Sequence, residues 1–458
     1  MAVEISSVEL GQIFSDNLTT TVTPLEEIIQ DVSTDTRSIL PNAVFIALVG
    51  DKFDGHNFVE QAIAKGAIAV VVNRELDIAS PTTQYVVKDT LRAYQQIAQW
   101  WRSRFEIPII GVTGSVGKTS TKELIAAVLG TKGKVLKTEK NYNNEIGVPK
   151  TLLQLSRDHD YAVIEMAMRG KGEIAELTEI AQPTIGVITN VGTAHIGRLG
   201  SREAIANAKC ELLAEMPASS TAILNQEQPL LMQTAQQIWQ GKTITYGIEH
   251  GDVSGKLVDN DCLEVAGIKL PLPLSGVHNA SNYLAAIAIA QELGIEISSL
   301  AQGLQVTLPQ GRSRCEKLAN NIWLLDETYN AGLESMQAAL KMLKQTPGDR
   351  QIAVLGTMKE LGEYSEKFHE QIGKTVAELD LDLLFVLADE PATKAIIAGA
   401  PTIESECFTD RRSLTDRLQN VIRSGDRILF KASNSVGLNQ VVEELKQSIC
   451  PGDYLPKT

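Results

Sequence analysis

The chain of 458 residues lacks the features of a membrane protein, a secreted protein and a nucleic-acid-binding protein. No stretch of eighteen residues is wholly apolar, and residues 1–10 contain two glutamates and no basic residue, so neither a membrane span nor a signal peptide is expected. Basic charge is scarce: 42 Lys and Arg against 56 Asp and Glu give a net charge of -14, which disfavours a broad nucleic-acid surface. We therefore expect a cytoplasmic protein, and the charge leaves the binding of phosphorylated small molecules open.

Cysteine is also rare, and no two cysteines form a C-x-x-C pair. A disulfide framework or a zinc ribbon would need clustered cysteines, so neither is expected. We interpret the thiols as buried or incidental; they are Cys210, Cys262, Cys315, Cys407 and Cys450.

The length and the spacing of apolar segments indicate an α/β protein of three domains. A chain of this length is long for one hydrophobic core. Residues 1–105 mix short strands and helices as a small α/β domain, and residues 106–308 alternate strands with helices as a central parallel-sheet domain. Residues 309–458 repeat that alternation and predict a Rossmann-like C-terminal domain. In such sheets ligands bind at the carboxyl ends of the strands.

A glycine-rich segment, Gly111–Ser120, follows an apolar strand and precedes a helical pattern. Glycines let backbone N–H groups surround an anion, and the helix N-terminus adds partial positive charge. Lys118 would reach the outer phosphates of a nucleoside triphosphate, and Thr119 would bind Mg²⁺. The candidate ATP-binding residues of this loop are Gly114, Ser115, Val116, Gly117, Lys118, Thr119 and Ser120.

The loop departs from the common phosphate-loop spacing. In G-x-x-x-x-G-K-[ST] the first glycine would stand where this chain has Val112. A glycine-rich turn without a ligand is the plain alternative, but strand, loop, Lys-Thr-Ser and helix occur in the required order. The segment therefore predicts triphosphate binding by a variant loop.

Three further side chains lie where a triphosphate site would need them. Glu165 ends an apolar strand, at a position where an acid often binds Mg²⁺ beside a phosphate loop. His195 follows the next strand, and the residues alone leave a metal ligand and a structural histidine equally open. Lys209 is on the next helix, where a solvated lysine is the ordinary interpretation.

Two polar segments occupy predicted loops. Residues 141–149 are rich in asparagine, which by itself is typical of a turn. Residues 326–330 follow a strand of the third domain, at the end where ligands bind, although acidic residues there also cap helices.

Together these segments resemble the Mur ligase family, ATP-dependent amide-bond ligases of bacterial cell-wall synthesis. The resemblance covers about residues 32–445, and the family loop T-G-[ST]-x-G-K-[ST]-[ST] matches Thr113–Ser120, which accounts for Val112. Residues 141–149, 326–331 and 356–363 favour the family step that joins D-alanyl-D-alanine to UDP-N-acetylmuramoyl-tripeptide through an acyl phosphate. The Asp-Asn-Pro-Arg sequence of the step that adds the third amino acid does not occur.

The resemblance implies ATP, two Mg²⁺ ions and two small-molecule substrates, and we expect a monomer. It implies that Lys118, His195 and Lys209 are catalytic. The implied Mg²⁺ ligands are Thr119, Glu165, His195 and a carbamylated Lys209. The implied adenosine contacts are Asn279, Arg312 and Asp326. The implied UDP contacts are Asp35, Thr36, Arg37, Asp54, Gly55 and His56. The implied acceptor or substrate loops contribute Asn141, Asn143, Asn144, Tyr329 and Asn330.

The sequence departs from the family pattern at two places. Ala331 is followed by Gly332-Leu333, where the family commonly has Asn-Pro. Asn434 stands where the family commonly has the arginine of Lys-Gly-Ser-Arg. We therefore expect no contact from position 434 like the one that arginine would make to substrate or phosphate, and Arg427 is a candidate replacement.

Three other functions stay open at this point. The first is another amide ligase of this architecture, such as a folylpolyglutamate synthetase or a different step of the Mur ligase family. The second is a nucleotide-dependent switch, but the Asn-Lys-x-Asp segment of a GTPase does not occur. The third is a family-like subunit that works with an amidotransferase, a type that often carries a four-cysteine zinc module, which the cysteine spacing disfavours.

Overall fold

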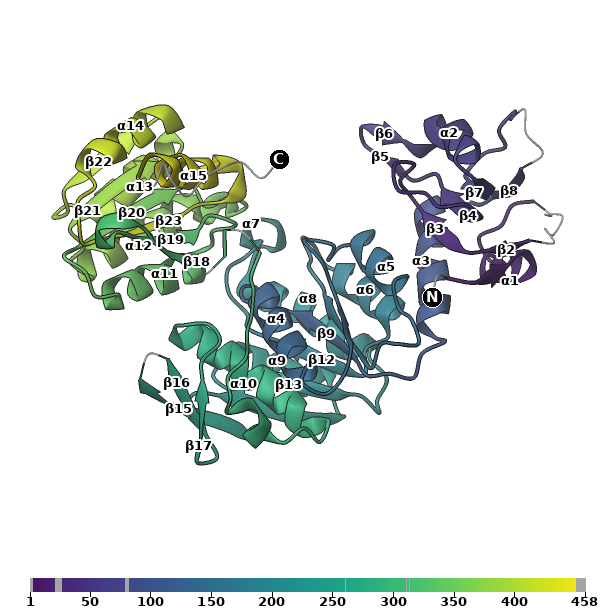
Figure 1. Cartoon of the computed structure of the whole chain (residues 1–458), viewed down its shortest axis with the longest axis horizontal. Coiled ribbons are helices and arrows are strands. Elements are labelled where there is room, and N and C mark those ends of the chain that lie inside the picture. The colour runs from purple at the N-terminus through teal and green to yellow at the C-terminus, as the bar shows by residue number, and fades with distance from the viewer. Residues whose placement is uncertain are drawn as a thin grey trace.

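The computed structural model describes residues 3–20, 27–78, 82–259, 261–309, 311–312 and 314–449. It contains three α/β units, with the central unit between the other two (Figure 1). The predicted fold class is therefore confirmed. Among the described residues, no helix is both long and apolar enough to cross a membrane. Four of the cysteines are free thiols, and Cys450 lies outside the described residues.

The N-terminal unit is built on a small parallel sheet in the order β3-β4-β7-β8. Its strands are β3 (Asp31–Ser33), β4 (Ala43–Ile46), β7 (Ala67–Val72) and β8 (Thr83–Val86). Its helices are α1 (Ser7–Ile13), α2 (Val59–Ala64) and α3 (Thr90–Arg102). Two short pairs, β1 (Ile5–Ser6) with β2 (Ile28–Ile29) and β5 (Val49–Gly50) with β6 (Phe53–Asp54), flank the sheet.

The central unit is built on a nine-stranded sheet in the order β10-β11-β9-β12-β13-β14-β15-β16-β17. Its strands are β9 (Ile109–Thr113), β10 (Val135–Lys137), β11 (Tyr161–Glu165), β12 (Ile185–Ile188), β13 (Thr221–Asn225), β14 (Lys242–Gly247), β15 (Val253–Asp259), β16 (Cys262–Val265) and β17 (Ile268–Pro271). Its helices are α4 (Lys118–Leu129), α5 (Gly147–Leu152), α6 (Glu173–Ala181), α7 (Ile196–Leu199), α8 (Arg202–Glu215), α9 (Pro229–Ile238) and α10 (Val277–Glu292). The sheet is parallel up to β15, and β15 to β17 are antiparallel.

The antiparallel end of the central sheet was not predicted. β16 and β17 join through Ala266 and Gly267, which both adopt positive φ (50° and 79°), as a two-residue hairpin turn requires. Asn-Gly and Asp-Gly are the usual signals of such a turn, and this chain has Ala-Gly instead. The sequence therefore offers little local indication of this hairpin.

Strand β9 lies in the interior of the sheet, between β11 and β12. All five of its residues are buried, because helices cover both faces of the sheet. Residues of α4 and α10 form one apolar cluster with β9 side chains such as Val112, and residues of α6 and α8 form another with Ile109. The loop after β9 is therefore held at the carboxyl edge of a rigid core.

The C-terminal unit has a six-stranded sheet in the order β18-β19-β23-β20-β21-β22, parallel except for β18. Its strands are β18 (Arg314–Lys317), β19 (Trp323–Glu327), β20 (Arg350–Gly356), β21 (Leu383–Leu387), β22 (Ser405–Phe408) and β23 (Asp426–Lys431). Its helices are α11 (Leu333–Gln345), α12 (Ser365–Glu378), α13 (Glu390–Gly399), α14 (Arg411–Val421) and α15 (Leu438–Ile449). Together they give the doubly wound form expected of a Rossmann-like domain.

Helix α3 joins the N-terminal unit to the central unit (Figure 1). Ala93 and Ile97 pack in the N-terminal core, while Arg102 donates hydrogen bonds to the carbonyl oxygens of Ala181 and Gln182, both at 2.8 Å. The helix therefore belongs to both units.

Candidate functional site

The phosphate-loop candidate is pinned to the carboxyl end of the neighbouring strand β12. The Ser115 N–H donates to the Asn190 carbonyl oxygen (3.1 Å), and the Val116 N–H donates to Asn190 Oδ1 (3.0 Å). The hydroxyl of Thr189 donates to the Val116 carbonyl oxygen (2.8 Å). A Cβ on Gly114 would lie 1.9 Å from Thr189 Oγ1, so only glycine fits this close approach. The strand-end rule that identified Glu165 applies equally to Thr189 and Asn190.

Lys118 and Thr119 begin helix α4, so their backbone N–H groups are at a helix N-terminus. The Lys118 ammonium folds back and donates to the Gly114 carbonyl oxygen (2.8 Å). Burial lowers the pKa of Lys118, and the nearby Glu165 carboxylate opposes that shift. The amine is thus held over the loop, where an anion would lie.

Glu165 is the last residue of β11, and its carboxylate is almost fully buried. Oε2 accepts a hydrogen bond from the Thr119 hydroxyl (2.9 Å), and Oε1 accepts one from the Asn143 amide (2.8 Å). A hydroxyl and a carboxylate are the hard oxygen ligands that Mg²⁺ prefers, so this donor set fits Mg²⁺ beside a triphosphate.

Lys122, a buried lysine that was not predicted from the sequence, lies next to the Glu165 carboxylate. Lys122 Nζ donates to the Thr138 carbonyl oxygen (2.7 Å), pairs with Glu123 (3.0 Å) and lies 3.9 Å from Glu165 Oε2. The Thr138 hydroxyl accepts from the Glu165 N–H (2.9 Å). The only signal in the sequence is a lysine on a helix face that is otherwise buried.

His195 and Lys209 lie within electrostatic reach of Lys118. Burial lowers the pKa of His195; the Glu360 carboxylate opposes this shift, and both Lys118 and Lys209 add to it. Lys209 is 1% exposed, and burial, with Lys118 adding to it, lowers its pKa well below the usual range. The ordinary expectation of a solvated Lys209 is therefore wrong.

A second Mg²⁺ site does not fit the side chains as the chain encodes them. Within the described residues, no three His, Cys, Asp or Glu side chains gather into a group that could hold a metal ion. His195 and Lys209 offer only nitrogen, and Mg²⁺ prefers oxygen. A carbamate on Lys209 would supply the missing carboxylate.

Two acidic side chains of the C-terminal unit reach the loop that carries His195. Glu334 Oε2 accepts a hydrogen bond from the Thr193 hydroxyl (3.0 Å). Glu360 Oε2 lies 2.5 Å from His195 Nδ1. The Glu360 carbonyl oxygen also accepts from the Gly197 N–H (3.2 Å). Glu334 was not predicted, and Glu360 was noted only as part of residues 356–363, because nothing local links either acid to residues so far away along the chain.

A cavity of about 700 Å³ brings the loop after β10 together with the C-terminal unit. The predicted residues that line it are Asn141, Arg312, Asp326, Tyr329 and Asn330. The Arg312 guanidinium stacks on the Tyr329 ring (3.7 Å), and its Nε is buried without a hydrogen-bond partner among the described residues. A buried, unpartnered donor in a cavity is ready for a ligand acceptor.

Three other predicted asparagines form hydrogen bonds within the protein: Asn143, Asn144 and Asn279. Asn143 holds Glu165, and Asn144 Oδ1 accepts from the Gly147 N–H (3.0 Å) at the start of α5. Asn279 is buried on α10 and accepts a hydrogen bond from Asn282 (3.4 Å). Asn282 in turn lies against Gly117, so Asn279 is one helical turn from the phosphate loop.

The suggested replacement by Arg427 is wrong. Its guanidinium donates to the carbonyl oxygens of Pro347 (2.6 Å), Asn321 (2.7 Å) and Gly425 (2.9 Å). Arg427 is near the start of β23, whereas Asn434 follows the other end of that strand. The Arg427 side chain therefore lies at the edge of the sheet opposite to Asn434.

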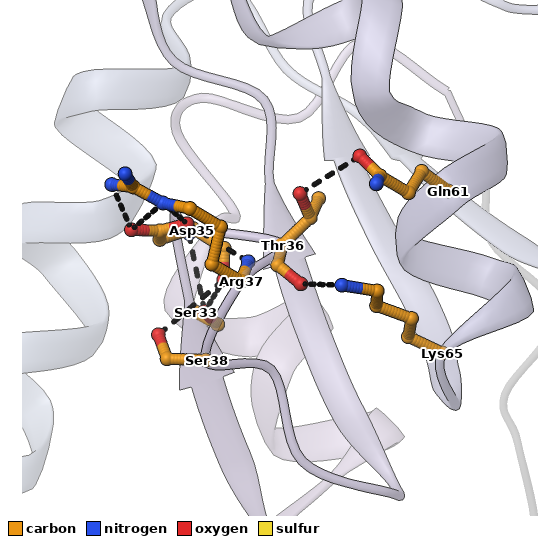
Figure 2. A network of polar contacts seen from close by, with 7 residues as sticks. All are labelled: Ser33, Asp35, Thr36, Arg37, Ser38, Gln61 and Lys65. Atoms are coloured by element: carbon orange, nitrogen blue, oxygen red, sulfur yellow. Dashed lines mark hydrogen bonds and ion pairs between the residues drawn. The ribbon is translucent and has the colours of Figure 1, made fainter.

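In the N-terminal unit, the loop after β3 carries Asp35 and Arg37 (Figure 2), of which Arg37 is exposed and Asp35 partly buried. The Arg37 guanidinium pairs with Asp35 (2.7 Å), and that contact lowers the pKa of Asp35 to about 2. Thr36 is turned toward α2: its hydroxyl donates to Gln61 (2.9 Å), and its carbonyl oxygen accepts from Lys65 (2.8 Å) (Figure 2). This network fixes the loop and leaves Arg37 exposed.

Asp54, Gly55 and His56 hold a turn together. Asp54 Oδ1 accepts from the His56 N–H (2.9 Å), and a Cβ on Gly55 would lie 2.7 Å from the Leu48 backbone. The His56 ring is buried, with Nδ1 2.5 Å from Asp54 and Nε2 accepting from the Asn73 N–H (3.1 Å). Both ring nitrogens of His56 therefore already contact protein atoms. A UDP contact at this turn would come from the backbone or from Asp54.

The fold and the loop define a class: a P-loop α/β enzyme with a lysine, a hydroxyl and a buried carboxylate at the edge of a parallel sheet. Three family models match the chain: the Mur ligase family catalytic domain at residues 28–100, the Mur ligase middle domain at 112–290, and the Mur ligase glutamate ligase domain at 311–434. The chain belongs to the Mur ligase family.

Similar proteins extend over nearly the whole chain. A UDP-N-acetylmuramoyl-tripeptide–D-alanyl-D-alanine ligase of Synechocystis sp. is 59% identical, over 94% of this chain and 96% of its own. The ligase of that name from Escherichia coli is 35% identical, over 91% and 94%. A crystal structure of MurF from Acinetobacter baumannii has a TM-score of 0.88 at 30% identity, over 97% and 99%. MurF ligase from Thermotoga maritima, solved in complex with ADP, has a TM-score of 0.81 at 30% identity, over 91% and 97%.

Replacing Glu165 by Gln is expected to raise the Mg²⁺ concentration for half-maximal activity about tenfold or more, because the amide keeps the shape but loses the charge. Calorimetric titration of Mg²⁺ into the enzyme with ADP should show the same weakening without catalysis. The matched control is Glu215→Gln, an exposed glutamate at the end of α8. Equal Mg²⁺ affinity in both variants would remove Glu165 from the metal site.

Proposed function

We propose that this chain is an ATP-dependent ligase that joins D-alanyl-D-alanine to UDP-N-acetylmuramoyl-tripeptide, a step of peptidoglycan precursor synthesis. The proposal rests on one observation: four side chains lie together at the carboxyl edge of the central sheet, namely Lys118, Glu165, His195 and Lys209. The C-terminal unit contacts the loop that carries His195. The names of the full-length relatives supply the substrates. The proposed domains are residues 1–105 for UDP, 106–308 for ATP and 309–458 for ligation.

The main task of such a site is to neutralise charge. The tripeptide carboxylate must attack the γ-phosphorus of ATP, and two unit charges 4 Å apart repel by about 1 kcal/mol in water and about 4 kcal/mol at an effective dielectric of 20. Lys118 supplies a positive charge, and the N-terminus of α4, which begins at Lys118, adds partial positive charge. Thr119, Glu165, His195 and a carbamylated Lys209 would hold Mg²⁺, which would neutralise the phosphate oxygens further.

The reaction has two steps. A carboxylate oxygen bonds to the γ-phosphorus, and the bond to ADP breaks, which leaves an acyl phosphate. The dipeptide amine then bonds to the acyl carbon, loses a proton, and phosphate departs. Water would destroy the acyl phosphate, so the contacts of Glu334 and Glu360 with the central loop suit a site that closes over it.

The remaining roles follow the geometry. The 700 Å³ cavity, with Arg312, Asp326 and Tyr329, is proposed for the adenosine part of ATP, and Asn141 and Asn330 would line its substrate side. Asp35, Thr36 and Arg37, with the Asp54–His56 turn, are proposed for UDP. The monomeric state and cytoplasmic location expected from the sequence stay predictions.

Phosphate release with a panel of acceptors tests the function. With ATP, Mg²⁺ and UDP-N-acetylmuramoyl-tripeptide present, only D-alanyl-D-alanine should give turnover. L-Alanyl-L-alanine, L-lysine and D-glutamate are matched controls, and tripeptides with lysine or diaminopimelate in third place identify the accepted donor. Turnover with D-glutamate, or phosphate release that needs no acceptor, would overturn the proposal.

A further inference from the structure

Two residues that meet across the boundary between the central and C-terminal units share an uncommon backbone conformation. His195 has φ of 66° and Glu360 has φ of 63°, in the left-handed region that favours glycine. Their side chains approach each other, with Glu360 Oε2 2.5 Å from His195 Nδ1. Backbone strain of this kind persists only where the surrounding structure imposes it, and it concentrates at functional sites. The pair is therefore a candidate for a function beyond joining the two units.

The backbone beside this pair is fixed by the close approach of two glycines. The Gly197 N–H donates to the Glu360 carbonyl oxygen (3.2 Å). A Cβ on Gly197 would lie 2.5 Å from the Gly362 backbone nitrogen, and Gly362 has φ of 56°. The two loops meet this closely because neither glycine has a side chain. The backbone therefore holds the Glu360 carboxylate against the loop that carries His195.

Each oxygen of the Glu360 carboxylate has a partner in the central unit. Oε1 accepts a hydrogen bond from Arg198 Nη2 (3.4 Å), on helix α7, while Oε2 faces His195 Nδ1. Among the described residues, no other group forms a hydrogen bond with this buried ring nitrogen. Arg198 thus orients the carboxylate, and the carboxylate faces one defined atom of the imidazole.

A carboxylate at Nδ1 decides where a neutral imidazole keeps its proton. One ring nitrogen of neutral histidine is a donor and the other an acceptor, and the hydrogen bond made by one nitrogen fixes the state of the other. A carboxylate only accepts, so the proton belongs on Nδ1, and Nε2 keeps a free electron pair. Histidines that act as ligands in proteins are commonly oriented in this way by a carboxylate.

We infer that Glu360 is a positioning residue for His195: it holds the ring proton on Nδ1 and leaves Nε2 as the electron-pair donor of the reaction site. The consequence for ligation rests on the proposed function. Glu360 belongs to the C-terminal unit, so His195 has this form only while that unit contacts the central unit. A side chain of the ATP-binding unit is thereby made ready by the unit assigned to ligation.

Nitrogen-15 NMR of enzyme labelled at histidine tests the inference without substrates, in mildly alkaline buffer. The chain has six histidines, and His195→Gln identifies the signals of His195. In the unchanged enzyme the proton should be on Nδ1, and Glu360→Ala should move it to Nε2, the form that neutral histidine prefers in water. Glu360→Gln retains an accepting oxygen, so it should keep the proton on Nδ1. Unchanged signals from the other histidines check the fold of each variant.

Glu334→Ala is the matched control. Glu334 is also an acid of the C-terminal unit on the same loop, but it accepts from the Thr193 hydroxyl (3.0 Å). Its loss should weaken the contact between the units and leave the His195 proton on Nδ1. A proton on Nε2 in the unchanged enzyme, a proton still on Nδ1 in Glu360→Ala, or an equal change in Glu334→Ala would each overturn the inference.

Ligation kinetics show whether the ring proton matters for the reaction. Glu360→Ala should lower kcat about 10- to 100-fold, the scale of losing a group that orients a ligand, and Glu360→Gln should recover most of the loss. The KM for D-alanyl-D-alanine should stay nearly unchanged, and a loss confined to this KM would contradict the positioning role. Absence of ligation by the unchanged enzyme would instead overturn the proposed function, and the NMR result would still decide whether Glu360 sets the form of His195.

Discussion

Replacing Lys118 by alanine is expected to lower the ligation rate about 10³-fold, the scale of losing one preorganised charge at a reacting group. Lys118 begins α4, and its ammonium lies over the loop, 2.8 Å from the Gly114 carbonyl oxygen. Phosphate oxygens entering the loop would replace that carbonyl as the acceptor. The loss should appear both in the kcat for phosphate release and in the affinity for ATP, measured by equilibrium titration.

A matched control separates the charge at the loop from lysine loss in general. Lys132 is exposed just beyond the end of α4, and Lys132→Ala should keep full activity. Lys118→Arg should restore little, because a planar guanidinium does not reproduce the compact ammonium that fits against the loop. Thermal unfolding of each variant checks the fold. A Lys118→Ala enzyme within threefold of the unchanged kcat/KM would refute the phosphate role.

The nucleotide loop was predictable because its determinants are local. Apolar residues, glycines and the Lys-Thr pair follow one another along the chain, so β9, the loop and α4 could be identified without neighbours. The position of Glu165 beside the loop was predictable for a similar reason, since a strand end in a parallel sheet has a known location relative to its neighbours.

The contacts between distant segments were not predictable in this way. Asn190 holds the loop from the next strand, and Glu334 and Glu360 approach from another unit. Their positions depend on how whole elements pack, which periodicity and spacing do not encode. The same limit explains the error over Arg427, which is near Asn434 in sequence but lies at the opposite edge of the sheet.

The buried site is arranged around positive charge. Lys118, Lys209 and His195 lie within electrostatic reach of one another, and burial disfavours their charged forms. Three adjacent cations would repel, so an unprotonated Lys209 relieves the site. A carbamate on Lys209 would reduce the repulsion further, because it places a negative charge next to Lys118.

Replacing Lys209 by alanine is therefore expected to lower activity about 100-fold, the scale of losing a metal-supporting group. A carbamate forms when a neutral amine bonds to the carbon of CO₂ and releases a proton. An ordinary lysine is protonated at pH 7; burial lowers the pKa of Lys209 well below its usual range, which favours the neutral amine that this reaction needs. Acetate or formate should partly restore Lys209→Ala, because a small carboxylate can enter the space left by the side chain, and should not restore Lys118→Ala.

Carbon-13 NMR of enzyme equilibrated with labelled bicarbonate tests the modification directly. One carbamate signal should appear in the unchanged enzyme and vanish in Lys209→Ala. Lys122 is the internal control: it is equally buried but is paired with Glu123 at 3.0 Å, so its amine is held in an ion pair and should add no second signal. A signal that persists in Lys209→Ala would assign the carbamate elsewhere. Full activity of that variant in bicarbonate-depleted buffer would show that the second metal position needs no carboxylate from Lys209.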